Sequence, residues 1–158
     1  MTGLGFALTL ACALGSGLIA GVFFGFSSFV MGALGRLPPA HGIAAMQVIN
    51  VVVINPVFLG AFVGTAILGG VLIVVALLAS SGSTALARIV GRLLYIAGTF
   101  GVTMMFNVPL NDALMRVAPE SAEGASFWAH YLARWTMWNH VRTAAGLLAA
   151  AALTLSLC

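Results

Sequence analysis

Long, nearly unbroken runs of apolar residues make up most of the chain, and short polar stretches separate them. A helix needs about 20 apolar residues to cross the hydrocarbon core of a bilayer. Four runs reach that length, and we expect a membrane-spanning helix in each: 4–33, 57–79, 87–108 and 136–157. Four consecutive spans predict an all-α fold, an antiparallel four-helix transmembrane bundle. Residues 1–158 are expected to form one domain.

The second apolar run, 43–79, is too long for one span. At 1.5 Å per residue it would extend about 55 Å, against a hydrocarbon core of about 30 Å. Pro56 divides the run, because proline lacks the N–H that a helix interior needs. We therefore expect a kinked second span, preceded by an interfacial helix over 43–55 that carries Gln47 and Asn50.

The composition is typical of a membrane protein. The chain is 62% hydrophobic and 6% charged, whereas soluble domains carry about 25% charged residues. The net charge of +3 is small and dispersed, so nucleic acid is excluded as a partner. We expect a multi-pass protein of a bacterial-type cytoplasmic membrane, in contact with membrane lipids. A homo-oligomer or a larger membrane complex stays open.

Two features of the apolar runs are interpreted as packing and anchoring. Gly17, Gly21 and Gly25 repeat every four residues and form a ridge on which another helix can approach closely. Arg88 and Arg92 lie one turn apart at the start of the third span, and we expect them to reach the phosphate headgroups of the bilayer. Neither feature predicts a substrate site.

Polar side chains gather in the stretch that opens the fourth span. At about 100° per residue, Trp135, Trp138, Asn139 and Arg142 share one face of a helix, and His140 lies about 100° away from Asn139. Two indoles, an amide and a guanidinium on one face predict one wall of a polar pocket.

Two further polar stretches are expected at the same end of the bundle. Gln47 and Asn50 belong to the interfacial helix, and Asn107 and Asn111 flank Pro109, where the third span kinks or stops. Amides at membrane depth need hydrogen-bond partners, so we expect them to face the bundle rather than lipid. These amides predict the other walls of the pocket.

The three histidines do not predict a three-histidine metal site. His130 and His140 would lie about 15 Å apart on one continuous helix and cannot share an ion. The spacings HxxxH, ExxH and CxxC are absent from the sequence. We predict no cofactor and no metal ligands, while ligation of haem by a single histidine, or of another metal, stays open.

The residue types of the pocket fit acid–base chemistry on a weakly acidic organic substrate. His140 can act as the general base. Asn107, Asn111 and Asn139 can hydrogen-bond the developing enolate or phenolate, and Arg142 can stabilise its charge. The alternative for His140 and Arg142 is a polar clamp that only ties helices together.

Three motifs resemble a known family. They are Ala45-Met46-Gln47-Val48-Ile49-Asn50, Asn107-Val108-Pro109-Leu110-Asn111 and Trp135-Thr136-Met137-Trp138-Asn139-His140-Val141-Arg142. In this order among four spans, they resemble the small membrane family known as anthrone oxygenase-like, over nearly the whole chain. Members are associated with the oxidation of anthrones to anthraquinones by molecular oxygen in polyketide pathways.

The resemblance implies an oxygenase, an oxidoreductase that acts on an apolar aromatic molecule such as an anthrone or quinone. An anthrone has an acidic methylene, whose carbanion reacts with oxygen once it is formed and stabilised. Under this hypothesis His140 is the base, Trp135 and Trp138 stack on the planar substrate, and Gln47 and Asn50 complete the polar mouth.

Two other functions stay open from the sequence. The chain could be a non-catalytic subunit of a larger membrane assembly that binds helices, lipids or pigments. It could also be a small transporter or channel, although the middle of each span is apolar and a continuous polar path is missing.

Overall fold

The computed structural model describes residues 3–78 and 84–157. Over these residues the chain is almost entirely helical and contains no strand, which confirms the all-α prediction. The elements are α1 (Gly3–Gly25), η1 (Phe26–Val30), α2 (Met31–Leu34), α3 (Pro39–Val52), α4 (Pro56–Leu78), α5 (Thr84–Leu93), η2 (Leu94–Gly101), η3 (Thr103–Asn107), α6 (Val108–Met115) and α7 (Ala122–Leu155). The three η segments are π-helical. Residue 79, the last of the second predicted span, lies outside the described residues.

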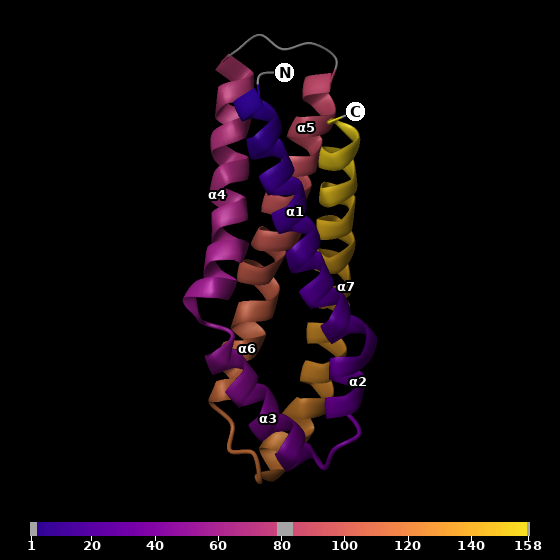
Figure 1. Cartoon of the computed structure of the whole chain (residues 1–158). Coiled ribbons are helices and arrows are strands. Elements are labelled where there is room, and N and C mark those ends of the chain that lie inside the picture. The colour runs from indigo at the N-terminus through magenta and orange to yellow at the C-terminus, as the bar shows by residue number, and fades with distance from the viewer. Residues whose placement is uncertain (1–2, 79–83, 158) are drawn as a thin grey trace.

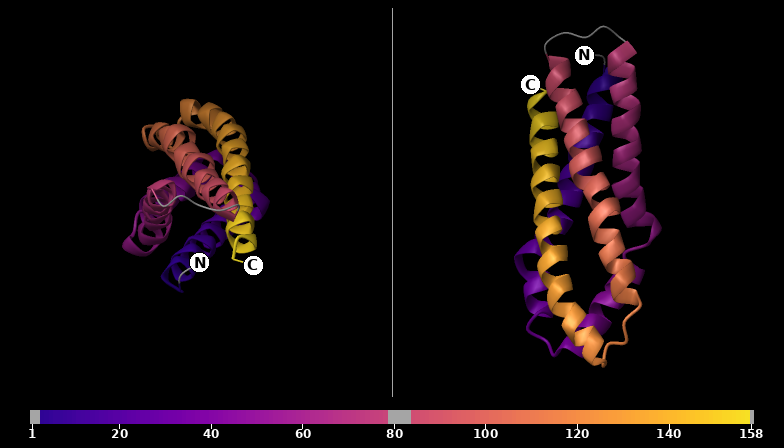
Figure 2. Two further views of the ribbon diagram at one scale, coloured as in Figure 1. Left: turned by 90° about the horizontal axis from the view of Figure 1, so that it is seen from above. Right: turned by 180° about the vertical axis from the view of Figure 1, so that it is seen from behind.

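The long helices run side by side along one axis (Figures 1 and 2). α1 leads away from the end where both labelled termini lie, and α4 returns towards it. The rod from α5 through η2 and η3 to α6 leads away again, and α7 returns. α3 lies at the opposite end, where it joins α2 to α4 (Figure 1).

Three helices are long and apolar enough to cross a membrane: Gly3–Leu34, Pro56–Leu78 and Leu86–Met115. They match the first three predicted spans and support an integral membrane protein. The fourth predicted span, 136–157, lies in α7, which is not among the three. Asn139, His140 and Arg142 lie inside the predicted span and lower its hydropathy, and the prediction of exactly four spans is not confirmed.

A separate helix before the second span and a break between the two are both present. α3 begins at Pro39, where the missing N–H costs nothing because the first N–H groups of a helix have no partner in the helix. α4 begins at Pro56 as a separate helix rather than as the continuation of a kinked one. The Asn55 side chain caps α4, because its Oδ1 accepts from the backbone N–H groups of Val57 (3.1 Å) and Phe58 (3.0 Å).

Glycines bring α7 close to α1 and to η2, but the predicted ridge of the first span is not where this happens. A Cβ added at Gly98 would lie 2.5 Å from the Cβ of Ala145, and one at Gly146 would lie 2.9 Å from the Cβ of Ala20. Gly21, in the middle of the predicted ridge, has no neighbouring atom within 4 Å of such a Cβ. Gly17, also of the ridge, faces α7 in ordinary contact, with 3.8 Å between such a Cβ and the Cβ of Ala150, so the closest approach of the helices lies outside the predicted ridge.

Arg92 is buried, with 4% of its surface exposed. Its Nη2 donates to Thr9 Oγ1 (3.1 Å) and its Nη1 to the carbonyl of Leu72 (3.3 Å). The expectation that Arg92 reaches lipid headgroups is wrong, because α5 directs this side chain between α1 and α4. The buried guanidinium instead ties these three helices together.

Candidate functional site

A cavity of about 830 Å³ lies among the helices, in the half of the molecule that contains α3. Every element except α2 and α5 contributes to its wall. Its volume is within the range of pockets that enclose small organic molecules. Apolar side chains form most of the wall, so the cavity fits a ligand that is largely apolar.

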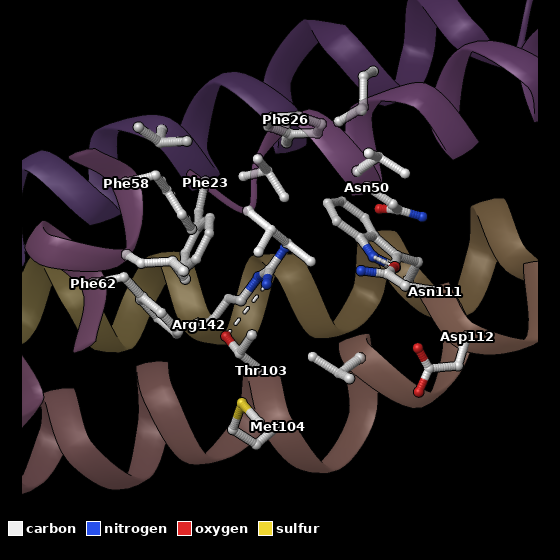
Figure 3. A pocket seen from close by; sticks show the side chains of 18 of the residues that line it. Phe23, Phe26, Asn50, Phe58, Phe62, Thr103, Met104, Asn111, Asp112 and Arg142 are labelled. Atoms are coloured by element: carbon white, nitrogen blue, oxygen red, sulfur yellow. Dashed lines mark hydrogen bonds between the residues drawn. The ribbon is translucent and has the colours of Figure 1, made fainter. Parts of the chain in front are cut away.

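Figure 3 shows how the labelled side chains divide this cavity. Phe23, Phe58 and Phe62 lie at one end, which we call the aromatic end. The rings of Phe58 and Phe62 are stacked with their centroids 5.7 Å apart, and Phe23 meets Phe62 edge to face at 6.1 Å. Arg142 and Thr103 lie nearer the middle (Figure 3). The aromatic end offers flat apolar surfaces and no polar side chain among the residues that define it.

The opposite end of the cavity carries the polar side chains Asn50, Asn111 and Asp112 (Figure 3). Asn50 comes from α3, whereas Asn111 and Asp112 come from α6. We call the Asn50 and Asn111 pair the amide end. Asp112 is exposed at the rim and is the only carboxylate among the lining residues that the structure describes.

Arg142 is held rigidly at the cavity wall. Its Nε donates to Asn139 Oδ1 (2.8 Å) and its Nη1 to Thr103 Oγ1 (3.3 Å). The guanidinium carbon lies 3.8 Å from the centroid of the Phe23 ring and 4.7 Å from that of Trp135, so the cation rests on two aromatic rings. The side chain is 4% exposed. Within the described part of the chain, Arg142 forms no ion pair with any of the three acidic residues.

Asn139 orients Arg142 and does not itself line the cavity. It is fully buried, and its Nδ2 donates to the carbonyl of Phe23 and to Ser27 Oγ, both at 2.6 Å. Ser27 belongs to the π-helical segment η1, where the backbone hydrogen bonds shift by one residue and free a carbonyl of the preceding turn. The amide therefore bridges α1 and α7 and leaves its Oδ1 to accept from Arg142.

Asn111 has a fixed orientation at the amide end. Its Oδ1 accepts from the Tyr131 hydroxyl and from Trp135 Nε1, both at 2.8 Å. An indole N–H can only donate, so the atom that it meets must be the amide oxygen. The Nδ2 group of Asn111 consequently points away from these two donors. Asn111 itself lines the cavity.

Asn50 is a buried amide, 9% exposed, that faces the cavity. Its Nδ2 has no hydrogen-bond partner among the residues that the structure describes. An unpaired buried N–H group costs about 1–3 kcal/mol, so an acceptor supplied by a ligand would be favourable here.

Of the nine predicted site residues, four line the cavity, one holds a lining residue in place, and four lie away from the site. Asn50, Asn111, Trp135 and Arg142 line the cavity, and Asn139 holds Arg142 from behind. Trp138 is half-buried and stacked on Phe106, with ring centroids 3.7 Å apart and an angle of 9° between the planes. The face of the Trp138 indole is thus covered by the Phe106 ring and not by the cavity.

The other three predicted residues also lie away from the cavity. Gln47 Nε2 donates to the carbonyls of Leu114 (2.9 Å) and Val117 (3.1 Å), so it closes the end of α6. Asn107 is fully buried, and its Nδ2 donates to the carbonyl of Trp135 (3.2 Å). His140 is exposed and is not part of the cavity wall. The structure therefore does not bring His140 together with the other candidate residues.

Within residues 3–78 and 84–157, no group of three His, Cys, Asp or Glu side chains is arranged to hold a metal ion. The polar chemistry of the cavity is that of hydrogen-bond donors, one cation and one carboxylate.

Sequence reasoning missed Thr103, Asp112 and the aromatic end. A signal for Thr103 exists, since Thr103, Asn107 and Asn111 repeat every four residues and mark one polar face on an otherwise apolar helix. For Phe58 and Phe62 we find no such signal, because aromatic residues in an apolar run are equally compatible with lipid contact.

Comparison with known proteins identifies the family. The family model described as anthrone oxygenase matches residues 56–152, more than half of the chain. The matched range includes Asn107, Asn111 and the stretch 135–142, and it begins after Asn50. No curated protein and no solved structure matches the chain. The family match, together with the apolar spanning helices, shows that the chain belongs to the anthrone oxygenase family.

Proposed function

We propose that this protein is a small membrane oxygenase that binds an apolar aromatic molecule, such as an anthrone, in the cavity and oxidises it with molecular oxygen. The observation that carries the proposal is the Arg142 guanidinium, which is buried at a mainly apolar cavity and has no acidic partner in the described residues. A buried charge is costly without a partner. An otherwise apolar ligand with one anionic oxygen would supply that partner, and the enolate of an anthrone is such a ligand.

The proposed reaction converts the methylene of the anthrone into a carbonyl. A base removes one methylene proton, and the electron pair moves onto the ketone oxygen, beside Arg142 and Thr103. The enolate carbon then bonds to O₂ and forms a peroxide anion, which takes a proton. Loss of the second C–H proton and of hydroxide, together one water, leaves the new C=O bond. Anthrone and O₂ thus give anthraquinone and water.

We assign the base to Asp112 rather than to His140. Asp112 lines the cavity at its rim, whereas His140 is exposed elsewhere on α7. A general base must reach the proton that it removes, so position at the cavity decides between the two residues. Arg142 lowers the energy of the enolate by stabilising its oxygen, which is electrostatic stabilisation of the developing charge.

For the whole molecule we propose an antiparallel four-helix transmembrane bundle in a bacterial-type cytoplasmic membrane, with 136–157 of α7 as the fourth span. The side chains at the rim of the cavity support entry of the ligand from the bilayer, between the helices. Val51 is 60% exposed, Ile54 69%, Met104 49% and Met115 46%, and all four line the cavity. These apolar side chains fit contact with lipid, so an apolar substrate dissolved in the bilayer would reach the site sideways.

Oxygen uptake by the purified protein in lipid nanodiscs, with anthrone as substrate, tests this function. We expect uptake to stop with Asp112→Asn and to continue with the matched control His140→Gln. Loss of activity with His140→Gln and not with Asp112→Asn would reverse the assignment of the base. If anthrone binds and the wild-type protein does not increase oxygen uptake above that of empty nanodiscs, the enzyme proposal fails and the non-catalytic alternative is favoured.

A further inference from the structure

The amide end, formed by Asn50 and Asn111, lies on the far side of Arg142 from the aromatic end (Figure 3). Asn50 Nδ2 is buried and unpartnered among the described residues. Asn111 is turned so that its oxygen meets Tyr131 and Trp135, which leaves its Nδ2 without either of these partners. Two amide side chains from different elements, α3 and α6, therefore line the same end of one cavity, and rotation of the unpaired Asn50 amide is enough to turn its Nδ2 toward a ligand there.

A pair of amide donors fits an acceptor oxygen of the ligand. The N–H groups of Asn side chains can only donate, so they match a carbonyl or peroxide oxygen and not a methylene. The aromatic end is defined by phenylalanines alone and has no such donor. Because the two ends of the cavity differ in this way, a flat ligand held at Arg142 would face hydrogen-bond donors on one side and phenylalanine rings on the other.

The chemistry of the substrate indicates which oxygen of the ligand the two amides would bind. In an anthrone the ketone and the methylene lie on opposite sides of the central ring. If the ketone oxygen contacts Arg142 and the methylene faces Asp112, which shares α6 with Asn111, then the methylene also faces the amide end. The substrate has no oxygen there, whereas the peroxide and the quinone product do.

We propose that Asn50 and Asn111 bind the oxygen that the reaction adds. This inference rests on the proposed function, and it deepens it by giving the amide end a role that starts only after O₂ has bonded to carbon. The two donors stabilise the peroxide anion and then the new carbonyl, and they contribute nothing to binding of the anthrone. Interactions that appear only along the reaction favour turnover, because they are absent from the bound substrate.

Asn50 is the more direct of the two residues to test. It makes no hydrogen bond through Nδ2 to the described protein, so Asn50→Leu removes an unpaired buried donor and keeps a side chain of similar size. The probes are anthraquinone, which has two opposed carbonyls, and anthrone kept free of oxygen, which has one. Binding of each to the protein in nanodiscs is measured by quenching of tryptophan fluorescence.

We expect Asn50→Leu to weaken anthraquinone binding about three- to tenfold, the value of one neutral hydrogen bond, and to leave anthrone binding unchanged. Asn111→Asp should act in the same direction, because it keeps an oxygen for Tyr131 and Trp135 and replaces the donor group by an acceptor. The matched control is Val52→Ala on α3, at a position that is 65% exposed and outside the cavity wall, and it should change neither affinity.

The outcomes separate the two proposals. If Asn50→Leu weakens both probes equally, or neither, the amide end does not recognise the added oxygen, and the proposed function is unaffected. If the wild-type protein binds neither probe, the proposed function itself is wrong. A selective loss for anthraquinone, in a protein that consumes oxygen with anthrone, supports the inference. The same loss without oxygen consumption overturns it, because the amide end then binds a carbonyl that no reaction adds.

Discussion

Asn139 Oδ1 lies 2.8 Å from Arg142 Nε, within one turn of α7. The same amide donates to the carbonyl of Phe23 and to Ser27 Oγ, so the contact between α1 and α7 and the direction of the guanidinium depend on one side chain. Asn139 is thus a positioning residue, which acts on a ligand only through Arg142.

Asn139→Asp should turn the hydrogen bond between residue 139 and Arg142 into an ion pair. The carboxylate would neutralise Arg142, so we expect the phenolate form of 2-hydroxyanthraquinone to bind roughly ten- to a hundredfold more weakly, from the value of a hydrogen bond to a charged group. The neutral phenol form should lose much less. Absorbance titrations above and below the pKa of the ligand measure the two affinities. Equal losses for both forms would mean that Asn139 only supports the fold.

Arg142→Lys should keep the positive charge and lose the planar contacts of the guanidinium. A guanidinium is planar and rests on the rings of Phe23 and Trp135 while it donates to Asn139 and Thr103, and an ammonium group cannot reproduce this arrangement. We expect oxygen uptake with anthrone to fall at least about tenfold, with the unfolding temperature changed little. Full activity with lysine would show that charge alone suffices and that the planar contact has no role.

The two tryptophans of the stretch 135–142 should respond differently. Trp138→Leu removes the stack with Phe106, and we expect the free energy of unfolding to fall by about 1–3 kcal/mol, without a change in anthraquinone affinity. Trp135→Leu removes a cavity wall and the hydrogen bond to Asn111 Oδ1, so it should weaken anthraquinone several-fold. Unfolding and binding titrations on both variants compare the roles. If Trp138→Leu reduced the affinity for anthraquinone and left the stability unchanged, Trp138 would contact the substrate as the sequence predicted.

Periodicity was sufficient to predict one wall of the site. Trp135, Asn139 and Arg142 share a helix face in the sequence, and all three are buried in the structure. The same periodicity directs His140 to another side, and it is indeed exposed. Residue chemistry alone favoured a histidine as the base, because it does not show which titratable group reaches a cavity that seven other elements help to form.

Burial of single polar residues depends on partners that are distant in the sequence. Arg92 looks like a headgroup contact at the start of a span, yet it meets Thr9, which is 83 residues away in the chain. The π-helical segments were equally out of reach. Each shifts the helix face by a fraction of a turn, and the glycines of η2 do not by themselves indicate a π-helix. The lengths of the apolar runs, by contrast, predicted four spans, of which three are found, because length is a local property.

Two glycines provide a final prediction, one that links helix packing to the site. Gly98→Ala would bring a Cβ to within 2.5 Å of the Cβ of Ala145, an atom fixed to the backbone of α7. The helices must move apart, and we expect a loss of about 1–3 kcal/mol in unfolding free energy. Thr103, five residues further along the same rod, should then move away from Arg142, so anthraquinone affinity should also fall.

The matched control is Gly21→Ala on α1, where no atom lies within 4 Å of the added Cβ. This variant should be neutral or stabilised by up to about 1 kcal/mol, because alanine has the higher helix propensity, and its ligand affinity should stay that of the wild type. Thermal unfolding and anthraquinone titration of both variants in the same detergent give the comparison. If Gly98→Ala were as stable as Gly21→Ala, the close approach of η2 and α7 would not be a constraint of the fold, and the Thr103 contact with Arg142 would need another support.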